Sequence, residues 1–186
     1  MKRLTPVFIV LFLLWGCGRT NSEMERAMAL REKLLKSSGS TFNAVITADY
    51  GEKIYTFEMK CQIDGIGNLS FEVKQPQTIS GITGTVSEEG GTLTFEDQVL
   101  AFEMLADGQI TPVSAPWLVV HTLRSGYISA CGKDDDGLHI QIDDSYAEDT
   151  LQVDVWTNET DLPVQAEILW EGRRIVTVSV KDFTIV

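Results

Sequence analysis

The chain contains 186 residues, of which 44% are apolar and 23% are charged, a size and composition that suit one globular domain. Acidic residues number 27 against 15 basic residues, so the formal net charge is −12. A surface of this sign repels phosphate, which excludes a nucleic-acid partner. The 15 glycines and 5 prolines are ordinary numbers for a folded protein and exclude the fibrous and disordered classes.

The N-terminus is organised like a bacterial export signal. A short basic start at residues 1–3 (MKR) precedes an almost entirely apolar run over residues 4–15. This run is typical of a signal-peptide core and is shorter than the roughly 20 residues of a membrane-spanning helix. It leads into LWGC at residues 14–17, which resembles the lipobox of bacterial lipoproteins, although Trp15 stands where that motif has a small residue.

The resemblance to the lipobox implies that residues 1–16 form a lipoprotein signal peptide and that Cys17 carries the lipid. An ordinary cleaved signal peptide with an unrelated cysteine is the alternative. Residues 17–21 would then be a short tether, and residues 22–186 a single extracytoplasmic domain anchored to the bacterial cell membrane. Because the acidic chain is repelled by anionic headgroups, attachment would rest on the acyl chains, at about 0.8 kcal/mol per buried methylene.

The first folded element is a predicted amphipathic helix over residues 22–38. The sequence SEME at residues 22–25 fits a capping box, and Gly39 lies just past the expected end. Apolar residues follow at helical spacing, namely Met24, Ala27, Met28, Leu30, Leu34 and Leu35. This stripe could dock on a sheet or lie on the membrane, and docking is favoured because the opposite face mixes acidic and basic residues.

After Gly39 the apolar period changes from 3.6 to 2 residues, which predicts β-strands. Six strands are expected before the middle of the chain, over residues 42–50, 55–63, 69–73, 79–87, 93–95 and 99–104. Tight turns containing glycine separate most of them. Consecutive strands joined in this way predict an antiparallel meander.

A second helix is predicted over residues 112–125, with Ser114 as candidate cap and Pro116 in the first turn. Strands resume over residues 127–130, 138–142, 151–156, 164–170 and 175–180. The expected fold is mainly β with two helices: one long meander of about eleven strands. Such a meander would form a curved antiparallel sheet or half-barrel with the helices packed on its concave face.

This order of elements resembles the half-barrel of the lipoprotein-carrier proteins LolA and LolB and of related lipid-binding lipoproteins. The sequences GITGTV at residues 81–86, LTF at 93–95 and SAPW at 114–117 are also similar to small uncharacterised lipoproteins of clostridial-type bacteria. The resemblance extends over nearly the whole mature chain. It implies a non-enzymatic envelope protein that binds a lipid or another hydrophobic ligand between sheet and helices.

Two cysteines remain once Cys17 is assigned to the anchor. In an exported domain, Cys61 and Cys131 are an even pair whose disulfide would contribute roughly 4 kcal/mol in the chain-entropy model. Two buried free thiols are the alternative. A metal site is not expected, because the two cysteines and two histidines lack the paired spacing of metal ligands.

The sequence predicts neither a catalytic site nor a cofactor. His121 falls in the apolar second helix and His139 in the outward register of a strand. Nucleophile-elbow, phosphate-loop and dinucleotide motifs are missing. The acidic runs at residues 134–136 and 143–144 predict solvated turns, because they lack the spacing of a calcium loop.

The concave face of the predicted sheet is the remaining candidate site. Its expected lining is rich in aromatic and flexible side chains, namely Phe42, Ile46, Phe57, Met59, Phe71, Phe95, Phe102, Met104 and Trp117. These residues suit an acyl chain, and they equally suit an ordinary packed core. The first interpretation predicts a lipid-binding lipoprotein. The second predicts a structural or protein-interaction module with a filled core, whose protein partner the sequence does not identify.

Overall fold

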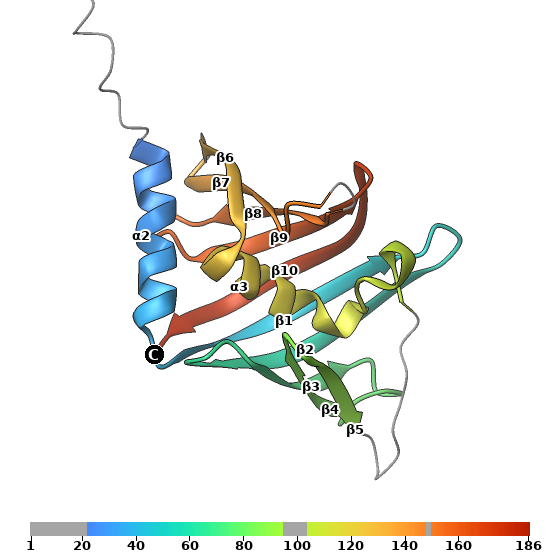
Figure 1. The fold of residues 1–186 in the computed structure, drawn as a ribbon. Helices are drawn as coiled ribbons and strands as arrows, with labels where there is room; N and C mark the ends of the chain where they lie inside the picture. The colour runs from blue at the N-terminus through green and yellow to red at the C-terminus, as the bar shows by residue number, and fades with distance from the viewer. Residues whose placement is uncertain (1–21, 95–103, 148–149) are drawn as a thin grey trace, which may run out of the picture.

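The computed structural model describes residues 22–94, 104–147 and 150–186. In this part of the chain ten strands form one antiparallel sheet, accompanied by two α-helices (Figure 1). The helices are α2 (Ser22–Lys36) and α3 (Ala115–Ser125), with 3₁₀ turns η2 (Ala106–Gly108) and η3 (Pro112–Ser114) before α3. The strands are β1 (Gly39–Asp49), β2 (Ile54–Asp64), β3 (Leu69–Gln75), β4 (Thr83–Ser87), β5 (Gly90–Thr94), β6 (Tyr127–Asp134), β7 (Gly137–Asp143), β8 (Gln152–Thr157), β9 (Pro163–Trp170) and β10 (Arg173–Ile185).

The predicted fold class is confirmed, but the predicted single meander is wrong. The strand order is β5-β4-β3-β2-β1-β10-β9-β8-β7-β6, so two five-strand meanders join where the first and last strands pair. In that central pair Ala44 faces Val180 and Ile46 faces Val178. Strands β5 and β6 lie at opposite edges of the sheet because the chain between them crosses its inner face as α3.

Several predicted boundaries shift for local reasons. The predicted helix over residues 22–38 ends at Lys36. Gly39 opens β1 with φ 155°, and a Cβ there would lie 2.3 Å from the carbonyl oxygen of Ile63. The predicted strand over residues 79–87 begins only at Thr83, since the chain before it forms turns. Of the predicted strand over residues 99–104, all but Met104 lies outside the described residues, and Met104 is not in a strand.

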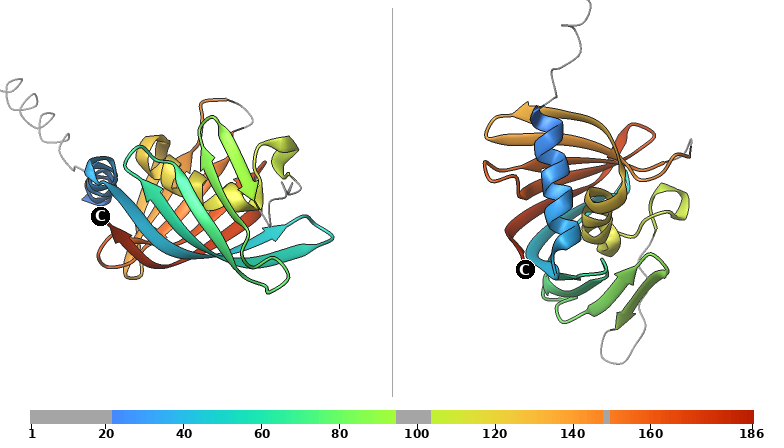
Figure 2. Two further views of the ribbon diagram at one scale, coloured as in Figure 1. Left: turned by 90° about the horizontal axis from the view of Figure 1, so that it is seen from below. Right: turned by 60° about the vertical axis from the view of Figure 1, so that its left-hand side comes forward.

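Helix α2 docks on the protein, as its apolar stripe predicts. Ala27, Leu30 and Leu34 are each at most 2% exposed, and the helix packs against α3 and the edge strand β6. The two views in Figure 2 show α2 standing at that end of the curved sheet. Neither helix of the described part is long and apolar enough to cross a membrane.

Each of the helices α2 and α3 supplies an arginine that donates hydrogen bonds to carbonyl groups at the C-terminal end of the other helix. Arg31 of α2 donates from Nε to Leu123 O at 2.7 Å and from Nη2 to Gly126 O at 2.7 Å. In return, Arg124 of α3 donates to Leu34 O of α2 at 2.9 Å. The last carbonyls of a helix have no intrahelical partner, so this exchange fixes the angle between the helices.

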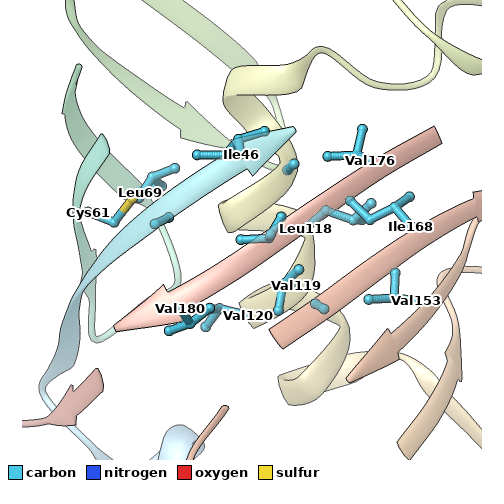
Figure 3. Close-up of a cluster of buried hydrophobic side chains, with 14 of the residues drawn as sticks. Ile46, Cys61, Leu69, Leu118, Val119, Val120, Val153, Ile168, Val176 and Val180 are labelled. Atoms are coloured by element: carbon cyan, nitrogen blue, oxygen red, sulfur yellow. The ribbon is translucent and has the colours of Figure 1, made fainter. Parts of the chain in front are cut away.

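Helix α3 fills the hollow of the sheet. Leu118, Val119, Val120 and Leu123 are at most 4% exposed, and the helix packs against β7, β8 and β10. Figure 3 shows its labelled side chains among those of the sheet, including Ile168 of β9. The centre of the concave face is therefore a packed hydrophobic core.

Candidate functional site

Most of the predicted ligand-lining residues that the structure describes belong to this packed core. Phe42, Ile46, Phe57, Met59 and Phe71 are all at most 4% exposed. They come from β1, β2 and β3 and share the inner face, as the strand alternation predicts. Their burial favours structural roles over contact with a ligand.

Two other predicted residues lie at a separate, open place. Met104 is 51% exposed, and Trp117 is half-buried at the start of α3. Both line a cleft of about 400 Å³ between the β4–β5 hairpin and the chain that leads into α3. Phe95 and Phe102, predicted for the same lining, lie outside the described residues.

The walls of this cleft, here called the hairpin cleft, combine apolar and small polar residues. Val86 and Leu93 come from the hairpin, and Val113 comes from η3. The lining residues that the structure describes are Thr85, Val86, Ser87, Glu88, Gly90, Gly91, Thr92, Leu93, Met104, Gln109, Thr111, Val113, Ser114 and Trp117. The sequence pattern does not single out Val86, Leu93 and Val113 as lining residues, although the first two fall in predicted strands. No pattern in the sequence indicates which part of the sheet the helix leaves uncovered.

The indole of Trp117 is held in place by one hydrogen bond and one ring contact. Its Nε1 donates to Gly67 O at 3.1 Å. Its ring stacks on His121, one helical turn later, with ring centroids 4.6 Å apart. The indole is therefore a fixed wall of the cleft, and binding a ligand would require little reordering of it.

The start of α3 is built differently from the prediction. Ser114 was expected to cap α3, but its side chain makes no cap bond to the helix. Instead Ser114 Oγ donates to Thr111 O at 2.8 Å and accepts from Thr111 N at 3.2 Å. The reason is that η3 runs directly into α3, which moves the capping box back to Thr111. This arrangement aligns Thr111, Ser114 and Trp117 along the cleft.

The hairpin that forms the other wall depends on a close approach at Gly84. A Cβ at this position would lie 2.3 Å from Thr92 O and 2.7 Å from the ring of Phe71. Gly84 is paired with Phe71 on one side and with Leu93 on the other. The missing side chain therefore lets β4 and β5 lie over the aromatic ring of β3.

Comparisons with known proteins find distant structural similarity at low sequence identity. No protein-family model and no curated sequence matches this chain. A LolA superfamily protein from Nitrosomonas europaea is similar with a TM-score of 0.46 and 12% identity, over 86% of this chain and 93% of that one. An uncharacterized conserved protein from Thermus thermophilus gives a TM-score of 0.47 and 11% identity, over 88% and 87%. LprF from Mycobacterium bovis gives 0.43 and 9%, over 88% and 93%. Similarity at this distance assigns no ligand or activity to this chain.

Ser125 and His121 lie within contact distance of each other on α3. Ser125 Oγ lies 3.3 Å from His121 Nε2, but it also lies 2.9 Å from His121 O, to which it donates its only proton. A serine bound in this way is not activated as a nucleophile. Within the described ranges, no group of three or more His, Cys, Asp or Glu could hold a metal ion.

The second histidine lies on the outer face of the sheet, as its register predicts. The ring of His139 stacks on Trp156 with centroids 4.5 Å apart, and its Nε2 lies 3.5 Å from Asp154 Oδ2. Asp154 is 8% exposed and also accepts from Gln152 Nε2 at 2.9 Å. These contacts connect β7 and β8 on the face opposite to the hairpin cleft.

The predicted disulfide is wrong, because no disulfide links Cys61 and Cys131. Cys61 lies in β2 and Cys131 in β6, and five strands separate β2 from β6 in the sheet. An even cysteine count does not reveal which strands become neighbours. The central pairing of β1 with β10 places the two cysteines in different halves of the sheet.

The two thiols should differ in reactivity. Burial raises the pKa of both thiols, but Cys61 is buried and Cys131 is only partly covered. Since the thiolate is the reactive form, native protein should be alkylated at Cys131 well before Cys61. In denaturant without reductant, mass spectrometry should find both labelled. Failure of both cysteines to label under those conditions would show that a disulfide links them.

Proposed function

We propose that this chain is a non-enzymatic lipoprotein, anchored outside the cytoplasm, that binds an apolar chain in the hairpin cleft. The observation that carries the proposal is the cleft itself. It has apolar walls from two different elements, next to the packed core of the inner face. Its volume of about 400 Å³ is in the range of small-molecule sites, about 300–1,000 Å³.

The apolar surface at the cleft supports this proposal over an accidental surface groove. Met104 leaves 51% of its surface exposed, and a ligand chain would cover it. Leu93 and Trp117, which are only partly buried, present further apolar surface from opposite walls. Covering such surface is favourable by about 25 cal/mol per Å², so an acyl or alkyl chain gains from entering.

A direct test is displacement of a fluorescent acyl probe, comparing Met104→Gln with Val164→Gln. Both side chains are exposed, at 51% and 39%, but Val164 is on β9, away from the hairpin cleft. Met104→Gln should weaken probe binding by about tenfold, which corresponds to about 1.4 kcal/mol, while Val164→Gln should leave it unchanged. Absence of saturable probe binding to the wild-type protein would remove the proposal.

The anchor supports a second prediction. Helix α2 begins at Ser22, five residues after Cys17, so lipidation there would hold the domain near the bilayer. Cys17→Ser should release the protein from the membrane fraction or block its processing, because the acyl chains supply the attachment. Fractionation and metabolic labelling with a fatty acid measure this. Unchanged membrane association, with no label on the wild-type protein, would contradict it.

A structural or protein-interaction module is the second candidate, and the packed inner face favours it. Phe42 stacks on Phe183 with ring centroids 5.2 Å apart, and α3 occupies the hollow of the sheet. A protein with this core can act through its outer surface alone. The same displacement measurement separates the candidates, because an interaction module needs no probe binding at the cleft.

A further inference from the structure

The charges at the hairpin cleft limit which chemical class of ligand can bind there. This step rests on the proposed function. Among the described lining residues Glu88 is the only charged one, and none is Lys, Arg or His. Glu88 and Glu89 form the exposed turn between β4 and β5. The chain as a whole carries −12. A carboxylate or phosphate headgroup would therefore meet like charge and no basic partner.

The start of α3 could still have attracted an anion, since helix N-termini offer free N–H groups. At this helix start, two of those donors are used within the chain and two are missing. Ser114 N donates to Thr111 O at 3.0 Å, and Ala115 N donates to Pro112 O. Pro112 and Pro116 have no N–H at all. The helix start thus lines the cleft without forming an anion site.

We infer that the hairpin cleft selects a single acyl chain with an uncharged, hydroxyl-bearing headgroup, of the monoacylglycerol type, over a chain that ends in a carboxylate or phosphate. Such a headgroup places no uncompensated charge beside Glu88. Ser87 and Thr111 line the same cleft, and they donate their hydroxyl protons to Gly90 O at 3.2 Å and to Ser114 Oγ at 3.1 Å. Their oxygens can therefore only accept, which suits a headgroup that donates a hydroxyl proton and not a carboxylate. A volume of about 400 Å³, at the small end of the ligand-site range, suits one chain.

The test uses the full-length protein in phosphatidylcholine nanodiscs and two photoreactive probes. Both probes carry the same diazirine-bearing chain, one as a glycerol ester and one as the free carboxylate. After irradiation, mass spectrometry measures labelling of the peptides that contain Leu93, Met104 and Trp117. The glycerol ester should label them about tenfold more than the carboxylate, the factor that corresponds to one unfavourable charge contact at a partly exposed site.

Charge reversal at the cleft supplies the decisive comparison. Glu88→Lys should raise labelling by the carboxylate probe to within about twofold of the glycerol ester, because it replaces like charge by a basic partner. Glu159→Lys makes the same change in the exposed turn between β8 and β9 and should leave the ratio unchanged.

The possible outcomes distinguish failure of the ligand selection from failure of the proposed binding at the hairpin cleft. Equal or stronger wild-type labelling by the carboxylate would overturn the selection while leaving cleft binding supported. A labelling ratio that is the same in Glu88→Lys and in the wild-type protein would also overturn the selection. If neither probe labels the three cleft peptides, the proposed function itself fails.

Discussion

Replacing Leu118 by alanine is expected to lower the free energy of unfolding by about 2–5 kcal/mol, the range for large-to-small changes in a core. Replacing Trp117 by alanine should lower it by less, although the indole is the larger side chain. Leu118 is 4% exposed and packs inside the hollow of the sheet. Trp117 is half-buried and faces the hairpin cleft, so its loss leaves a wider cleft rather than an enclosed cavity.

Ligand retention should follow the opposite order. Trp117→Ala removes a fixed wall of the cleft and should weaken acyl-probe binding, whereas Leu118→Ala should change binding little at temperatures where the protein stays folded. Urea unfolding and probe displacement on both variants measure the two effects. A larger stability loss for Trp117→Ala, with no change in probe binding, would assign Trp117 to the core and favour the interaction module.

The strand faces could be predicted from the sequence because alternation is a local property. Phe57, Met59 and Phe71 alternate with polar neighbours, and all three lie inward. Strand partners are set by contacts between distant segments, which alternation does not encode. For that reason β1 was expected at one end of a meander, whereas it lies at the centre beside β10.

The candidate site was harder to predict than the fold. An inward aromatic residue has the same sequence pattern whether a helix packs on it or a ligand does. Phe57 and Trp117 were grouped together, yet Phe57 is 4% exposed and Trp117 lines an open cleft. The difference depends on where α3 crosses the sheet, and its position is fixed by Arg31 and Arg124. Long-range side-chain to backbone bonds of this kind leave no periodic trace in the sequence.

Replacing Gly84 by alanine is expected to destabilise the protein by about 1–3 kcal/mol, the usual range for overpacking, and to abolish probe binding at the hairpin cleft. The new Cβ would lie 2.3 Å from Thr92 O and 2.7 Å from the ring of Phe71. Strand β5 must therefore move, and with it Leu93 and the hairpin wall. Gly132→Ala is the matched control, because no atom outside its immediate chain neighbours lies within 4 Å of a Cβ at that position in β6.

A second substitution shows which contact matters in the Gly84→Ala variant. Phe71→Leu removes the part of the ring that the new methyl group would strike, so the double variant should regain part of the lost stability and probe affinity. Recovery should stay incomplete, since the carbonyl of Thr92 is backbone and cannot be shortened. Such non-additivity is expected for residues in direct contact. Wild-type stability and affinity in Gly84→Ala alone would show that the hairpin moves freely over β3, and the cleft could not then be a preformed site.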